Sequence, residues 1–196
     1  MNHLAHFFLS STHPELMIGG FLGDFVKGQL RDQYQPAIIS GIRLHRAIDV
    51  YTDQHPIVKC SHSRFNQEFR RFAPIICDIV YDHFLASQWP TYSSDSLEGF
   101  SAHCYETVLN AKIPEKARNT LKRMQNHNAL ASYANEEFIK HALINISGRL
   151  KRDNPLTRGF GSYEEIREPL NEDFGAFMPE LIAFVEAWQT THFSAE

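Results

Sequence analysis

The chain has 196 residues and a formal net charge of −4 at pH 7, from 19 basic and 23 acidic residues. Hydrophobic residues make up 43% and charged residues 21%, which excludes disorder, collagen-like repeats and coiled coils. The length is ample for one hydrophobic core, so we expect a single domain over residues 1–196. Because the net charge is negative, no general field attracts a polyanion, and we expect no nucleic-acid partner.

The sequence also limits where the protein works. No apolar run approaches the roughly 20 residues that a membrane helix needs. The first residues, MNHLAHFFLSST, carry neither the basic region nor the small-residue cleavage pattern of a signal peptide. We therefore expect no membrane partner and a cytoplasmic location. The three cysteines are widely spaced, which favours reduced core thiols over disulfides or a zinc site: Cys60, Cys77 and Cys104.

Prolines divide the chain into segments with helical periodicity. They stand at positions 14, 36, 56, 74, 90 and 114. Because proline suits the first turn of a helix, most of them are expected to open one. Further helical windows are Leu97–Leu109, Ala117–Leu130, Glu136–Leu150 and Pro179–Trp188, whereas residues 151–163 concentrate Pro, Gly, Asn and charge and predict a surface loop. No hairpin signal is found, so the predicted fold is an all-α helical bundle.

Two of the predicted helices carry histidine and carboxylate together. His45 and Asp49 are four residues apart, about 40° around a helix axis, and so share a face. Asp78 and Asp82 repeat this spacing, and His83 follows about 100° further round. Neutral imidazole and carboxylate are ligands that Mn, Fe, Zn and Mg ions share. Several carboxylates buried together also require a cation, so the pattern predicts a divalent metal site.

Each pair has an ordinary alternative, a hydrogen-bonded pair on a solvated helix face. The second helix is not expected to be a solvated face, because part of it must be buried. Apolar residues flank Asp82 and His83: Ile75, Ile76, Ile79, Val80, Phe84 and Leu85. Two N-terminal residues in apolar surroundings could join the site. Asp24 either joins it or serves as a helix cap or ion-pair partner, because an unpaired buried aspartate is unfavourable. His6 either joins it or is a hydrogen-bonded core histidine.

Four segments of the sequence together resemble the acyl carrier protein phosphodiesterases: MNHLAH, GGFLGDFVKG, GIRLHRAIDVYTDQHP and RRFAPIICDIVYDHFL. The likeness covers residues 1–90 by motif and the remaining helical length more loosely. It implies an all-helical fold distantly similar to HD-domain phosphohydrolases. It also implies a divalent metal, usually Mn²⁺, with Mg²⁺ or Fe²⁺ as alternatives. The implied reaction cleaves the phosphodiester between a carrier-protein serine and 4′-phosphopantetheine, converting holo carrier protein to the apo form.

The resemblance also implies roles for individual residues. The expected metal ligands are Asp24, His45, Asp78 and Asp82. His83 or His6 is expected to protonate the departing serine oxygen, and Asp49 either ligates the metal or orients His45. The histidine–aspartate pair that names the HD superfamily is reversed here, as Asp82–His83.

The implied partner, acyl carrier protein, is generally acidic, so this net-negative chain needs a local basic surface to bind it. We expect that surface at Arg64, Arg70 and Arg71, just before the Asp78 helix. A second basic stretch is Lys116, Arg118, Lys122 and Arg123. Either stretch is otherwise an ordinary solvated face.

Two other functions fit the same residues. One is a metal-dependent phosphohydrolase acting on a nucleotide or a small phosphate ester. The other is a helical module that binds a metal or a carrier protein without turnover, in which case the ion would lack an open coordination position.

Overall fold

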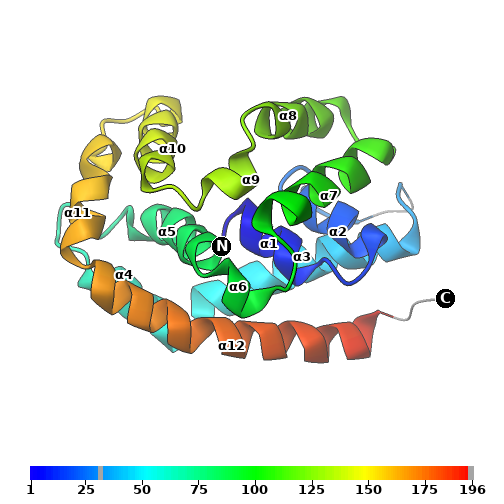
Figure 1. Cartoon of the computed structure of the whole chain (residues 1–196), viewed down its shortest axis with the longest axis horizontal. Coiled ribbons are helices and arrows are strands. Elements are labelled where there is room, and N and C mark those ends of the chain that lie inside the picture. The colour runs from blue at the N-terminus through cyan, green and yellow to red at the C-terminus, as the bar shows by residue number, and fades with distance from the viewer. Residues whose placement is uncertain (31–32, 194–196) are drawn as a thin grey trace.

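A computed structural model describes residues 1–30 and 33–193. These residues form twelve α-helices and one short 3-10 helix, with no strand among them, which confirms the all-α prediction. In chain order the elements are α1 (His3–Leu9), α2 (Pro14–Leu22), α3 (Pro36–Gln54), α4 (Pro56–Arg64), α5 (Ala73–Ser87), α6 (Trp89–Tyr92), α7 (Leu97–Asn110), α8 (Glu115–Asn126), α9 (Ala129–Ser132), α10 (Glu136–Arg149), η1 (Leu156–Arg158), α11 (Gly159–Glu165) and α12 (Arg167–His192). Figure 1 shows α1 near the middle of the molecule and α12 along one side.

The prolines open helices as predicted. Helices α2, α3, α4, α5 and α6 each have a proline in the first two positions, and Pro114 is the N-cap of α8. The fixed backbone angle of proline suits this place, and its missing N–H removes no hydrogen bond there.

Three predicted boundaries are wrong, each because of a particular local feature. The predicted helix Ala117–Leu130 is interrupted at Asn128, whose φ of 43° is left-handed. The predicted loop 151–163 is partly helical, because Phe160 and Tyr163 are buried in the core and their packing outweighs the helix-weakening glycines. The helix predicted to begin at Pro179 begins at Arg167 instead, and α12 continues through this proline. The buried apolar face of α12 stabilises the helix despite the proline.

Helices α2 and α3 form the most extensive helix–helix contact within the described residues. Glycines make this possible, because a methyl group on Gly19 would overlap the backbone of Ile38 and Gly41. The two backbones therefore touch directly. This contact sets the position of α3 relative to the turn that follows α2, and both segments carry residues of the candidate site.

The cysteine and membrane predictions can be compared with the fold. All three cysteines are free thiols. Cys77 and Cys104 are buried as predicted, but Cys60 is exposed on α4, so the core assignment is wrong for that residue. In the described part of the chain, no helix combines the length and the apolar character needed to cross a membrane.

Candidate metal centre

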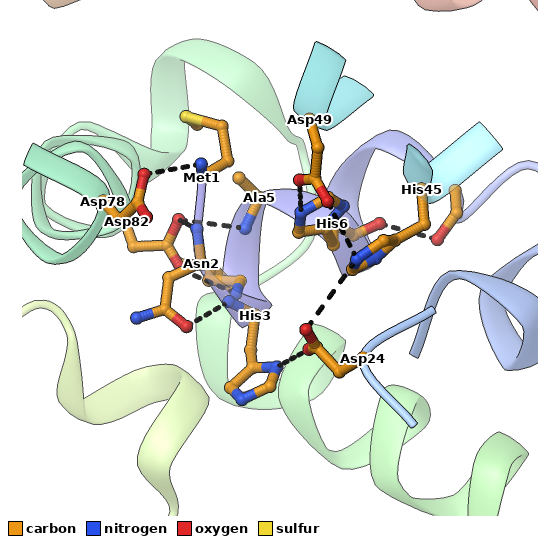
Figure 2. Close-up of polar contacts among 12 residues, drawn as sticks. Met1, Asn2, His3, Ala5, His6, Asp24, His45, Asp49, Asp78 and Asp82 are labelled. Atoms are coloured by element: carbon orange, nitrogen blue, oxygen red, sulfur yellow. Dashed lines mark hydrogen bonds and ion pairs between the residues drawn. The ribbon is translucent and has the colours of Figure 1, made fainter. Parts of the chain in front are cut away.

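Three side chains from α1 and α3 converge at one point (Figure 2). The Nε2 atom of His6 lies 3.1 Å from one carboxylate oxygen of Asp49, and the Nε2 atom of His45 lies 3.3 Å from the other. One possible ligand atom from each residue lies within 4.8 Å of the other two. The i,i+4 spacing of His45 and Asp49 produces the contact on α3, and α1 brings His6 to the same carboxylate.

Asp24 faces this cluster from the turn after α2. Its carboxylate lies 3.8 Å from Nε2 of His45 and 3.5 Å from Nδ1 of His3, and its side chain is 45% exposed. Asp24 is therefore a fourth possible ligand, a carboxylate beside Asp49 and the two imidazoles. His3 contributes to this environment although it was not among the predicted site residues. Its position three residues before His6, on the same face of α1, is the signal that could have identified it.

The two imidazoles are held in an unusual way. Their rings stack with centroids 3.9 Å apart at an interplanar angle of 20°. Both Nδ1 atoms are buried without a hydrogen-bond partner among the described residues. A hydrogen-bonded core histidine would have both ring nitrogens satisfied, so that alternative does not describe His6. The rings are instead oriented by their Nε2 atoms, which both point to Asp49.

The protonation states suit a divalent ion. Burial lowers the pKa of His6 to about 4, outweighing the opposing effect of Asp49, so the ring is neutral at pH 7. Burial disfavours ionisation of Asp49, but hydrogen bonds from His45 and His6 outweigh it and hold its pKa well below its usual range. A neutral imidazole and an ionised carboxylate are the forms that bind metal. The residues of the cluster therefore fit the implied ion.

Gly23 and Arg46 fix the turn that carries Asp24. A methyl group on Gly23 would overlap the imidazole of His45, so only glycine allows this ring to pack against the turn. Next to His45 on α3, Arg46 donates a hydrogen bond of 2.9 Å to the carbonyl of Val26. These contacts hold the turn against α3 and keep Asp24 close to the histidine.

The structure places Asp82 outside the cluster. Its buried carboxylate accepts hydrogen bonds from the backbone N–H groups of Asn2, Leu4 and Ala5, at 3.2, 2.7 and 3.3 Å. Burial raises its pKa to about 7, opposed by the Met1 amine and these donors. Asp82 therefore satisfies the start of α1 and positions the helix that carries His6.

Asp78 lies across a pocket from the cluster. Its carboxylate accepts a 2.7 Å hydrogen bond from the Met1 amine and is 45% exposed. The pocket has a volume of about 350 Å³, and its acidic lining is Asp24, Asp49, Asp53 and Asp78. No lysine or arginine of residues 1–30 and 33–193 lines it. Asp53 was not among the predicted site residues, although its four-residue spacing from Asp49 could have indicated it. Four carboxylates with so little compensating charge favour a bound cation.

His83 does not reach this pocket. Its Nδ1 lies 2.8 Å from the carbonyl oxygen of Tyr133, and the ring lines a different pocket with Arg167. The physical reason is the rotation between adjacent residues of a helix, which turns His83 about 100° away from Asp82.

The basic residues before α5 have different surroundings. Arg64 donates two hydrogen bonds to Asp173, at 2.7 and 2.8 Å, and Arg70 donates to the carbonyl oxygens of Phe65 and Ser63. Arg71 is exposed and has no ion pair within the described residues. In the second basic stretch, Arg118 donates to two carbonyl oxygens at the end of α7, whereas Lys116 and Lys122 are exposed.

Fold and site together define a class: an all-helical protein with two histidines and two aspartates gathered at an acidic pocket. The family model described as acyl carrier protein phosphodiesterase matches residues 1–181. The chain belongs to this family.

Relatives with that name align over nearly the whole chain. The acyl carrier protein phosphodiesterase of Serratia proteamaculans is 35% identical over 185 residues, covering 93% of this chain and 96% of the relative. That of Yersinia enterocolitica is 35% identical over 191 residues with the same coverage. That of Photorhabdus laumondii is 33% identical over 195 residues, covering 95% and 96%. No solved structure matches the chain, so the distant similarity to HD-domain phosphohydrolases stays a prediction.

Proposed function

We propose that this protein hydrolyses holo acyl carrier protein at the phosphodiester of its modified serine, giving apo carrier protein and 4′-phosphopantetheine. Membership of the acyl carrier protein phosphodiesterase family supports the substrate. The observation that carries the proposal is the convergence of His6, His45 and Asp49, with Asp24 beside them, at a pocket open to solvent.

A divalent ion, most simply Mn²⁺ with Mg²⁺ or Fe²⁺ as alternatives, belongs to this proposal. His6, His45, Asp49 and Asp24 would hold it. Asp78, on the opposite wall, is the remaining member of the predicted ligand set with an exposed carboxylate. When bound, the ion polarises the phosphoryl oxygen and lowers the pKa of a water molecule.

The residues of the chain orient the two imidazoles and the carboxylate of Asp24. Asp49 fixes the Nε2 atoms of both imidazoles, and the Gly23 turn sets the distance between Asp24 and His45. The sequence predicts either His83 or His6 as the proton donor. Nε2 of His6 lies close to the possible ligand atoms of His45 and Asp49, which favours metal ligation by His6. His83 lies away from this cluster and takes no part in the proposed reaction.

The intact mass of purified holo acyl carrier protein tests the proposal. After incubation with the wild-type chain and Mn²⁺, we expect the carrier protein to lose the whole phosphopantetheine mass. No loss is expected with EDTA or with His45→Ala. An unchanged mass in the wild-type reaction would contradict the proposal.

The same preparation distinguishes the two other functions. Release of phosphate from nucleotides or small phosphate esters, without cleavage of the carrier, would indicate the broader phosphohydrolase. Retention of the metal without any hydrolysis would indicate a binding module.

A further inference from the structure

A second pocket lies between the start of α5 and the end of α10. It has a volume of about 360 Å³ and is lined by Arg71, Phe72, Leu150, Lys151, Arg152 and Asp153. None of these residues belongs to the metal centre.

This second pocket continues from the first along the same two helices. Ile75 on α5 and Ile146 on α10 line the pocket of the metal centre. Phe72 precedes Ile75 by three residues, and Leu150 follows Ile146 by four. These are one-turn spacings, and α5 packs against α10. Phe72 and Leu150 of the second pocket therefore lie about one helical turn from two residues that line the pocket of the metal centre.

Its charge is opposite to that of the rest of the molecule. Three of its residues are basic and one is acidic, although the chain has a net charge of −4. In the described part of the chain, the side chains of Arg71, Lys151 and Arg152 form no ion pair. Arg64 and Arg70, by contrast, are occupied by internal contacts.

The pocket also has an apolar component. Leu150 is 39% exposed, one of few large hydrophobic side chains in the described residues with this much contact with water. Phe72 lies beside it, half-buried. An exposed apolar residue surrounded by unpaired cations fits a protein surface with acidic and apolar side chains better than a phosphate backbone.

We propose that this pocket docks the acidic surface of the carrier protein, with Arg71, Lys151 and Arg152 facing carboxylates and Leu150 facing an apolar side chain. The inference rests on the proposed function. It replaces a docking surface on Arg64, Arg70 and Arg71 with one that keeps only Arg71 and adds the chain after α10. The position next to the pocket of the metal centre brings the modified serine of a docked carrier towards that pocket.

Binding of fluorescently labelled apo acyl carrier protein tests this, because the apo form lacks the arm and is not turned over. In fluorescence anisotropy, Lys151→Glu/Arg152→Glu is expected to raise the dissociation constant by about tenfold and to flatten its salt dependence. The matched control reverses two exposed charges of the other basic stretch, Lys116→Glu/Lys122→Glu. It is expected to change the dissociation constant less than about twofold. Leu150→Ser is expected to weaken binding without changing the salt dependence.

Equal effects of the two charge-reversal variants, or no effect of either, would overturn the proposed docking site. The holo-carrier mass assay on the wild-type chain separates this result from the proposed function. Cleavage with an unaltered KM for Lys151→Glu/Arg152→Glu would reject the pocket and keep the function. Salt-dependent binding at the pocket without cleavage would keep the docking site and reject the function.

Discussion

The stacked rings of His6 and His45 are joined through a single carboxylate. One carboxylate oxygen of Asp49 lies 3.1 Å from Nε2 of His6, and the other lies 3.3 Å from Nε2 of His45. Asp49 thereby links α1 to α3. The Nδ1 atom of each ring has no hydrogen-bond partner among the described residues. The geometry of the centre therefore depends strongly on this one side chain.

Asp49→Asn tests that dependence. The amide has nearly the same shape but lacks the negative charge that orients the imidazoles and binds cations. We expect metal affinity, measured by calorimetry, and turnover of holo carrier protein each to fall by about 10- to 100-fold. Asp53→Asn is the matched control, one turn along α3 in the same pocket but outside the cluster. Equal losses in the two variants would contradict the assigned role of Asp49.

Gly23→Ala tests the packing of His45. The backbone at Gly23 is right-handed helical, with φ of −52°, so alanine adds no backbone strain and only its methyl group matters. Because that group would overlap the imidazole, we expect kcat/KM to fall by about a hundredfold. Gly175→Ala on α12 is the control, since a methyl group there meets no atom within 4 Å. Wild-type activity in Gly23→Ala would show that the ring moves without consequence.

Asp82→Asn tests the contact between Asp82 and the start of α1 through its dependence on pH. The pKa of Asp82 is about 7 in the folded protein against 3.8 for an ordinary carboxyl, so the folded state binds more protons between these values. Protonation of Asp82 therefore contributes to the free energy of unfolding at low pH, and this contribution is lost as pH rises through 7. An asparagine side chain does not titrate, so Asp82→Asn lacks this contribution. Its stability relative to wild type should therefore increase from pH 4 to pH 8 in urea unfolding followed by circular dichroism. Parallel curves would rule out this titration.

His83→Ala tests whether the adjacent histidine takes part in the reaction. The imidazole bonds the carbonyl of Tyr133 and is buried, so its loss is expected to destabilise the fold by about 1–3 kcal/mol. Turnover per folded molecule should stay near that of the wild type. The opposite pattern, full thermal stability with lost turnover, would return His83 to the reaction as the proton donor.

Helix periodicity predicted part of the centre from sequence and left part of it open. The i,i+4 spacing of His45 and Asp49 gave a contact that the structure contains. The same spacing predicted that Asp78 and Asp82 share a helix face, but it could not predict which segment packs against that face. The segment is the start of α1, far away in sequence, whose backbone N–H groups donate hydrogen bonds to Asp82. Burial likewise made residues 159–165 helical where local composition predicted a loop.

The glycine contact between α2 and α3 has a consequence for how the centre can adapt. With backbone against backbone at Gly19 and Gly41, these two helices have no side-chain layer that could yield. Asp24 and His45 therefore belong to a stiff half of the centre. Helix α1 instead contacts α2 and α5 through side chains and through hydrogen bonds to Asp82, and such contacts tolerate small displacements better than direct backbone packing does. Ions of different radius would accordingly be accommodated by a shift of His6, the adjustable half.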